Sequence, residues 1–223
     1  MLHKLLLAAT VFLLPSMALT SGEASAERVG EMQQIQCGNL VYAGTRSSTC
    51  FADKFLSRVA AETTVPAARS FTDLRLGLPE FFNTPFCIVS GEGSFALSAN
   101  EMTALKHHLN SGGFILASPS CSNREWDTAF RNIVNSLFPQ GLTTIPMDHP
   151  IFSIVHKVDK ITLKHGGKST LEGLFINGRL AMAYSKDGLN DAHNAKGCCC
   201  CGGDMINESQ QINVNIFTYS MAR

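Results

Sequence analysis

Four consecutive cysteines, Cys198, Cys199, Cys200 and Cys201, are the most distinctive chemical feature of the sequence, and glycines flank them on both sides. Thiolates are the ligands that zinc, copper(I) and iron–sulfur clusters prefer. The run therefore predicts a metal or redox site, for zinc or copper, with His193 and Asp204 as additional candidate ligands. Structural zinc sites separate paired cysteines by two to four residues. A single ion would thus take two of the four thiolates, whereas a cluster of several copper ions accommodates the run better.

Disulfide bonds are the competing interpretation of the same residues. The chain has eight cysteines, and exported proteins commonly oxidise theirs. Cys37 and Cys50 could pair with each other, or either could pair with the cysteine run, and so could Cys121. Cys87 lies inside an apolar segment, which predicts a packed thiol.

Cys121 is also a candidate nucleophile. It follows the apolar segment 114–117 and precedes a predicted helix, whose N-terminus would lower the pKa of a thiol. Catalysis would need a base such as His149, oriented by Asp148 or Glu92. The alternative is that Cys121 is structural and that residues 148–150 form a turn whose side chains cap backbone groups.

A small ligand-binding site is predicted where the buried strands end. Glu92 follows one predicted strand, and Ser118 and Ser120 follow the next. Ligands of open α/β sheets bind outside the carboxyl ends of the strands, so these side chains, together with Asp148, are expected to converge there. A simple tight turn at residues 91–93 is the alternative.

The first 26 residues have the pattern of a secretory signal peptide. A short basic start precedes an apolar run at residues 5–14, and Ala24-Ser25-Ala26 resembles a cleavage site. We therefore expect a signal peptide at residues 1–26, a flexible lead-in at 27–36 and a single domain at 37–223. The mature protein would be periplasmic or extracellular. No later segment is long and apolar enough to span a membrane.

The mature sequence alternates between strand and helix patterns. Strands are predicted at 39–43, 85–91 and 114–117, with an ambiguous, edge-like extended stretch around 71–76. Helices are predicted from about residue 49 to Pro66, after a capping box formed by Ser98 and Glu101, and from a second capping box at Ser122 to Pro139. This order predicts a mostly parallel sheet that is covered on both faces.

The remaining elements are expected at one edge of the sheet. Ile145 and residues 151–155 are strand candidates, and Asn177-Gly178 predicts a hairpin turn between residues 174–176 and 180–184. That hairpin implies an antiparallel extension. Residues 212–221 form either a helix or a late strand.

Seven segments, in their order and spacing, resemble a known bacterial family. They are residues 84–93, 97–109, 112–117, 126–138, 142–146, 148–152 and 177–185. The chain resembles the domain of unknown function 4159 family, which implies a fold similar to that of class I glutamine amidotransferases, a flavodoxin-like three-layer sandwich. Those enzymes hold their nucleophile in a Gly-x-Cys-x-Gly turn, whereas Cys121 lacks both glycines and Pro119 restrains the turn. The resemblance supplies no activity.

Composition narrows the function further. Eighteen basic residues balance eighteen acidic ones, so nothing in the net charge favours nucleic acid as a partner. We expect an exported, non-catalytic binding or scaffold module with a protein or cell-envelope partner. The alternatives are a thiol-dependent metal or redox protein that uses the cysteine run, and, less favoured, a hydrolase or transferase dependent on Cys121.

Overall fold

The computed structural model describes residues 34–47, 54–189 and 206–222 of the chain. The backbone divides into two units, Met1–Glu31 and Met32–Arg223. All of the described residues belong to the second unit, whose fold is a layered α/β sheet. The run of four cysteines and Cys50 lie outside the described residues.

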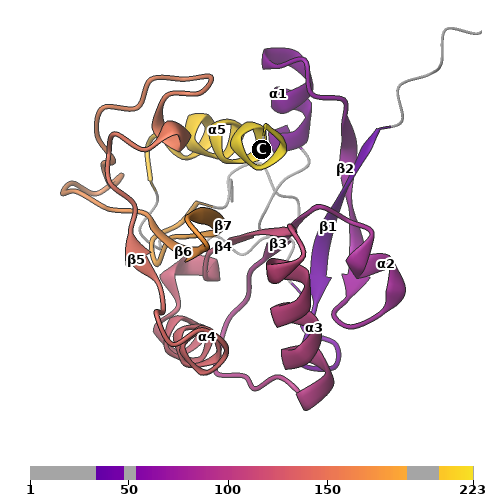
Figure 1. The fold of residues 1–223 in the computed structure, drawn as a ribbon. Helices are drawn as coiled ribbons and strands as arrows, with labels where there is room; N and C mark the ends of the chain where they lie inside the picture. The colour runs from indigo at the N-terminus through magenta and orange to yellow at the C-terminus, as the bar shows by residue number, and fades with distance from the viewer. Residues whose placement is uncertain (1–33, 48–53, 190–205, 223) are drawn as a thin grey trace, which may run out of the picture. The chain divides into compact units, whose positions relative to one another are not determined.

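Seven strands form one sheet in the order β2-β1-β3-β4-β7-β6-β5 (Figure 1). The five strands β2, β1, β3, β4 and β7 run parallel, and β6 and β5 extend the sheet antiparallel. The predicted mostly parallel sheet with an antiparallel edge is therefore confirmed. The strands are β1 (Ile35–Val41), β2 (Ala67–Arg75), β3 (Phe86–Val89), β4 (Phe114–Ala117), β5 (Thr143–Thr144), β6 (Glu172–Ile176) and β7 (Arg179–Tyr184).

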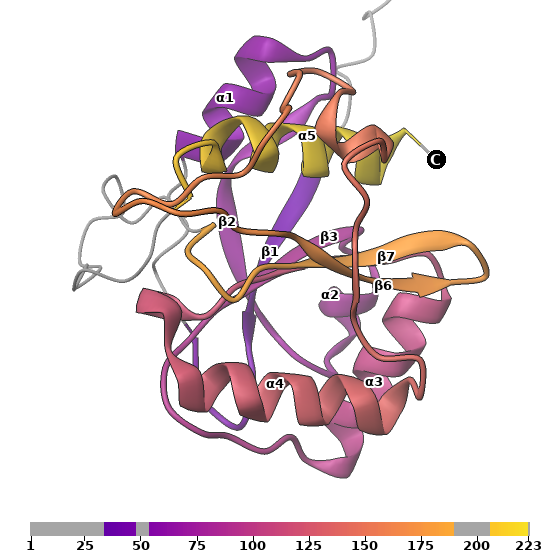
Figure 2. The same cartoon turned by 90° about the vertical axis from the view of Figure 1, so that its left-hand side faces the viewer.

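Helices cover both faces of the sheet and make three layers. One face carries α1 (Lys54–Glu62) and α5 (Ser209–Met221), and the other carries α2 (Pro79–Phe82), α3 (Ala99–Asn110) and α4 (Arg124–Leu137) (Figure 2). A separate apolar cluster fills each space between helices and sheet. This arrangement explains why every residue of β3 and β4 is buried, since a central parallel strand packs against helices on both sides.

Local signals placed some boundaries correctly. The Ser98 side chain accepts a hydrogen bond from the Glu101 N–H at 3.3 Å, and the Glu101 carboxylate accepts one from the Ser98 N–H at 2.8 Å. The predicted capping box of α3 is thus confirmed. The hairpin at Asn177 and Gly178 is also confirmed, with φ of 50° and 77°, the left-handed conformations that a type I′ turn needs.

Other boundaries differ from the prediction. The second capping box is wrong, because Asn123 rather than Ser122 caps α4, with its side chain accepting from the Trp126 N–H at 2.9 Å. The strand predicted at residues 151–155 is also wrong. Pro150–Phe152 is a 3-10 turn (η2), which the Nδ1 of His149 caps. Residues 212–221, predicted as either a helix or a late strand, are part of the helix α5.

Candidate functional site

The carboxyl end of the parallel sheet brings four loops together. Strand β1 continues into residues 42–47, β3 into 90–93, β4 into 118–123 and β7 into 185–189. The chain leaves β1 toward β2 on one side and reaches β3 on the other. The gap between the ends of β1 and β3 is thus the point where strand order reverses, which is where open α/β sheets bind ligands.

A cleft of about 340 Å³ lies at this point. It is lined by Tyr42, Thr45, Arg46, Ser47, Gly91, Glu92 and Ser120. We name this set of residues the polar cleft, because the lining combines hydroxyl groups with one guanidinium and one carboxylate. Its volume falls within the range of small-molecule sites, about 300 to 1,000 Å³.

Arg46 is held at the rim by backbone contacts. Its Nη1 donates to the backbone carbonyl of Glu92 at 2.9 Å. Its own N–H and C=O exchange hydrogen bonds with Tyr42 at 2.9 and 2.8 Å, which closes a tight loop after β1. The guanidinium is exposed to solvent yet fixed near the end of β3, so it offers a positioned positive charge.

A buried hydrogen-bond chain forms the floor of the polar cleft. Trp126 Nε1 donates to the Tyr42 hydroxyl at 2.6 Å, and that hydroxyl donates to the Ser90 carbonyl at 3.1 Å. The Ser90 and Ser120 hydroxyls lie 3.1 Å apart. Burial raises the pKa of Tyr42, against smaller opposing effects of the Trp126 hydrogen bond and the Arg46 charge. The Tyr42 hydroxyl therefore stays protonated and serves as a fixed link.

Gly91 is required by this floor. A Cβ atom at position 91 would lie 2.1 Å from the Tyr42 hydroxyl and 2.8 Å from Trp126 Nε1. Real Cβ atoms essentially never approach other atoms below 3.0 Å. The β3 loop can therefore pass over the tyrosine–tryptophan pair only because residue 91 has no side chain.

The turn after β4 has a strained backbone, although the sequence lacks the two glycines that such a sharp turn usually contains. Cys121 has φ 50° and ψ 33°, and Ser122 has φ 52°. The Asn123 N–H closes the turn on the Ser120 carbonyl at 3.0 Å. Two consecutive left-handed residues are the pattern of a type I′ turn, which glycine and asparagine normally occupy. A sharp turn thus forms here without glycine and carries Ser120 to the polar cleft.

Asn123 ties this turn to the neighbouring loop. Its Oδ1 accepts from the Trp126 N–H at 2.9 Å and from the Gly93 N–H at 3.0 Å. One side chain therefore caps α4 and fixes the loop after β3. Together with the Arg46–Glu92 hydrogen bond, these contacts hold the loops after β1, β3 and β4 in one geometry around the polar cleft.

The predicted catalytic set is not assembled. Cys121 lies in the left-handed turn that follows β4. His149 packs against Phe175 and Tyr219. Phe175 pairs with Leu180 near the start of β7, whereas the β4 residues that precede Cys121 pair with the end of β7.

Leu180, which pairs with Phe175, and Tyr184, which pairs with the end of β4, are four residues apart on β7. At the usual rise of a strand this separation is roughly 13 Å. Burial lowers the pKa of His149, against a smaller opposing effect of Asp148. The Asp148 side chain is exposed. The His149 ring instead caps the 3-10 turn, which is the structural role that the sequence left as the alternative.

The predicted ligand-binding residues divide into two groups. Glu92 and Ser120 line the polar cleft. Ser118 is fully buried, donates to the Asp187 carbonyl at 3.1 Å and accepts from the Leu189 N–H at 3.3 Å. Ser118 is therefore an anchor for the loop after β7 rather than a lining residue.

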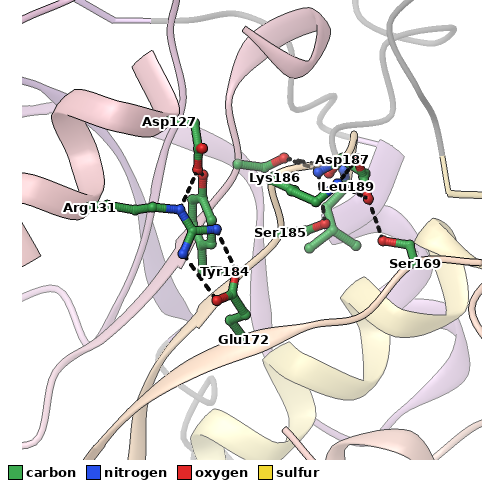
Figure 3. Close-up of polar contacts among 10 residues, drawn as sticks. Asp127, Arg131, Ser169, Glu172, Tyr184, Ser185, Lys186, Asp187 and Leu189 are labelled. Carbon is green, nitrogen blue, oxygen red and sulfur yellow. Dashed lines mark hydrogen bonds and ion pairs between the residues drawn. The ribbon is translucent and has the colours of Figure 1, made fainter. Parts of the chain in front are cut away.

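The side chain of Asp187 completes that anchor. It accepts from the Ser169 hydroxyl at 2.5 Å and from Lys186 Nζ at 3.1 Å (Figure 3). The Asp187 side chain is only 5% exposed, whereas that of Lys186 is 61% exposed. The buried carboxylate is thus satisfied by neighbours from two loops, which fixes the start of the segment that leads away from β7.

A second ionic cluster joins α4 to the antiparallel edge. Arg131 binds both carboxylate oxygens of Glu172, at 3.0 and 2.5 Å, and its Nε contacts Asp127 at 2.7 Å (Figure 3). The Tyr184 hydroxyl donates to the same Asp127. The hydrogen bond with Glu172 raises the pKa of Arg131, and that with Asp127 adds to it against the effect of burial. The cluster joins α4 to β6 and β7 and so positions the helix.

Two of the described cysteines are packed in the core. Cys37 and Cys87 are free, fully buried thiols, so Cys37 is not a disulfide partner, and the packed thiol predicted for Cys87 is confirmed. Within residues 34–47, 54–189 and 206–222, no group of three His, Cys, Asp or Glu residues could hold a metal ion. The predicted zinc or copper site at Cys198, Cys199, Cys200 and Cys201 lies outside those ranges, as does Cys50.

Sequence reasoning missed Tyr42, Arg46 and the other lining residues after β1. Their loop was visible as a polar stretch after a predicted strand, but nothing local shows that β1 lies next to β3. That neighbourhood follows from strand order, which short-range patterns do not encode.

The fold is that of an α/β protein with a flavodoxin-like strand order, 2-1-3-4 followed by a fifth parallel strand. Its polar cleft lies where the strand order reverses. The chain belongs to the family described as domain of unknown function 4159, whose model matches residues 40–221. A comparison with curated proteins finds no match. Among the described residues, no helix has the length and apolar character needed to cross a bilayer.

Proposed function

We propose that the protein is a non-catalytic binding module that holds a small polar ligand in the polar cleft, with an anionic group of the ligand on Arg46. The observation that carries the proposal is the position of a 340 Å³ hydroxyl-lined hollow at the reversal of strand order. That position is the usual ligand site of open α/β sheets.

The lining supports this ligand chemistry. A guanidinium donates several hydrogen bonds in a planar fork that matches a carboxylate or phosphate. Arg46 uses its Nη1 on the Glu92 carbonyl, which fixes the group before a ligand arrives. Thr45 and Ser47 add hydroxyl-bearing side chains to the same lining. Fixed donors favour binding because less conformational entropy is lost when the ligand binds.

The catalytic candidates support binding rather than turnover. The candidate base, the His149 ring, packs near the start of β7, whereas Cys121 follows the part of β4 that pairs with the end of β7. The hydroxyl at the floor, that of Tyr42, is engaged as both donor and acceptor. These groups hold the loops in place, which suits a rigid receptor.

Thermal unfolding with a panel of small anions tests the proposal. The probes are inorganic phosphate, citrate and L-glutamate, each added separately to the full chain. A ligand at about 100 times its Kd stabilises by about 2.7 kcal/mol, so a bound probe raises the Tm of the wild type and this rise is lost in Arg46→Gln.

Arg69→Gln is the matched control, because Arg69 is an exposed arginine on the edge strand β2, away from the polar cleft. It is expected to keep the full response to the probe. The proposal is contradicted when none of the three anions raises the Tm, or when Arg46→Gln responds as the wild type does.

Export forms the second part of the proposal. The basic start, the apolar run and the small residues before Glu27 support a cleaved signal peptide, with the mature protein in the periplasm or outside the cell. The intact mass of the protein purified after expression of the full chain tests this. A mass that begins at Glu27 supports export with cleavage, and a mass that retains Met1 in the exported fraction opposes it.

A further inference from the structure

A second groove lies on the α3–α4 face of the sheet, and one of its lining residues, Phe95, packs against the Tyr42 and Trp126 rings of the polar cleft's floor. Its volume is about 350 Å³. One wall is the segment 94–97, which joins β3 to α3, and the other is the outer side of α4; Figure 2 shows the two running alongside each other. The lining residues are Ser94, Phe95, Ala96, Leu97, Met102, Thr128, Ala129, Asn132, Ile133 and Ser136. We name this set the helix groove.

The segment 94–97 has the form of an unpaired strand. It belongs to no helix or turn, and burial alternates along it, with Phe95 and Leu97 half-buried and Ser94 and Ala96 exposed. Neither the backbone nor the side chains of these four residues make a hydrogen bond within the described chain. An extended segment with free N–H and C=O groups is a template for pairing with another chain.

The opposite wall carries a row of polar groups four residues apart on α4. Thr128 donates to the Arg124 carbonyl and Ser136 to the Ile133 carbonyl, so both hydroxyls already have an acceptor. The exposed amide of Asn132, midway between them, makes no hydrogen bond within the described residues. An amide offers one acceptor and two donors, which matches the main chain of a peptide.

The floor between the two walls is apolar. Ala129 and Ile133 are 7% and 8% exposed, and Phe95, Leu97 and Met102 are half-buried beside them. None of the ten lining residues is charged. A charged side chain would lose its hydration in this groove without gaining a partner, so the lining favours an uncharged occupant with apolar side chains.

We infer that the helix groove binds an extended, uncharged peptide segment of a partner protein by strand addition. The peptide main chain pairs with residues 94–97 along one edge and with the Asn132 amide along the other. Every second side chain of the peptide then points onto the floor at Met102 and Ile133. This mode combines main-chain hydrogen bonds for affinity with pockets for alternate side chains. The two linings share no residue, and the peptide probe and the Asn132 variant test the helix groove without any change to the polar cleft.

Hydrogen exchange of the full chain tests the inference. The probe is a pool of acetylated and amidated hexapeptides with Ala, Val, Leu, Ser, Thr and Asn at random in every position. Strand addition pairs alternate residues, so exchange at two alternate amides among residues 94–97 is expected to slow at least about tenfold. The control pool has the same composition but is methylated on every backbone nitrogen, and it is expected to leave exchange unchanged.

Two matched variants locate the site. Asn132→Ala removes the amide in the groove and is expected to reduce the slowing at least about threefold. Asn135→Ala removes an exposed amide from the same helix outside the lining and is expected to leave it intact. The inference is overturned when the random pool does not slow these amides, when the methylated pool slows them equally, or when Asn132→Ala and Asn135→Ala behave alike.

Discussion

Substituting Gly91 by alanine tests the floor of the polar cleft most sharply. The added Cβ would meet the Tyr42 hydroxyl at 2.1 Å and Trp126 Nε1 at 2.8 Å. Tyr42 is 2% exposed and Trp126 is fully buried, so neither ring can swing into solvent. Either the Tyr42 or the Trp126 side chain must therefore shift. The shift breaks the hydrogen bond from the Tyr42 hydroxyl to the Ser90 carbonyl or the one from Trp126 Nε1 to the Tyr42 hydroxyl.

Two costs add in the alanine variant. Overpacking a buried site costs about 1 to 3 kcal/mol, and leaving a buried donor or acceptor unpaired costs about 1 to 3 kcal/mol. Gly91→Ala is therefore expected to lower the free energy of unfolding by about 3 kcal/mol. Urea unfolding at constant m-value measures it.

A double-mutant cycle separates this mechanism from a general effect of the added methyl group. Tyr42→Phe removes the atom closest to the new Cβ and is expected to cost about 1 to 3 kcal/mol on its own, since Trp126 Nε1 loses its acceptor. The double variant Gly91→Ala/Tyr42→Phe is expected to be more stable than the sum of the single effects by at least about 1 kcal/mol. A Gly91→Ala variant within about 0.5 kcal/mol of the wild type, or strictly additive variants, would show that the close contact at position 91 does not govern stability.

Three further predictions concern backbone strain, protonation and thiols. Ser122→Gly is expected to raise the free energy of unfolding by up to about 1 kcal/mol in urea titrations, because a left-handed residue with a side chain is strained by about 1 to 2 kcal/mol; a loss of stability would contradict this. Burial, with smaller effects of the Arg179 and His107 charges, lowers the pKa of His108 to about 4 from 6.5. Between pH 6.5 and 4, His108 is protonated in the unfolded state but stays neutral in the folded state. The free energy of unfolding therefore falls by about 3 kcal/mol as the pH drops from 6.5 to 4. His108→Leu should flatten this pH profile, and the exposed His165→Gln should not. Equal slopes in all three proteins would exclude the mechanism. Burial raises the pKa of Cys37 to about 12, and burial also raises that of Cys87, so both thiols should react with a disulfide reagent only at the rate of unfolding; rapid labelling of the native protein would contradict their burial.

Short-range signals in the sequence were enough for much of the fold. The Ser98 capping box depends on two side chains three residues apart, and the hairpin depends on the Asn177-Gly178 pair. Each is decided within a few residues of chain, so each could be predicted. The apolar runs of β3 and β4 likewise identify strands that are buried on both faces.

Competition between local signals explains the misplaced elements. Ser122 and Asn123 are both good N-caps, but Ser122 is already committed to the left-handed turn after β4, so Asn123 caps the helix. Residues 151–155 have the composition of a strand, yet His149 and Pro150 favour a capped turn, and none of the described strands pairs with them.

The candidate site was predictable only in part. Glu92 and Ser120 follow buried strands, and the rule that ligands bind at carboxyl ends was sufficient to select them. Arg46 could not be selected, because its role depends on β1 lying beside β3 and on a contact with the Glu92 carbonyl. Ser118 satisfies the same rule as Ser120, but it points toward the loop after β7, an orientation that only the packing of that loop decides.

Chemical-shift mapping is the decisive measurement for a ligand site in the polar cleft. Inorganic phosphate, citrate and L-glutamate are titrated separately into the isotope-labelled full chain and into its Arg46→Gln variant. A small-ligand site at the reversal of strand order predicts saturable shifts for the amides of Arg46, Glu92 and Ser120 with at least one anion, and their loss in the variant. Shifts confined to other parts of the sheet, or shifts at these amides that persist in Arg46→Gln, would contradict it.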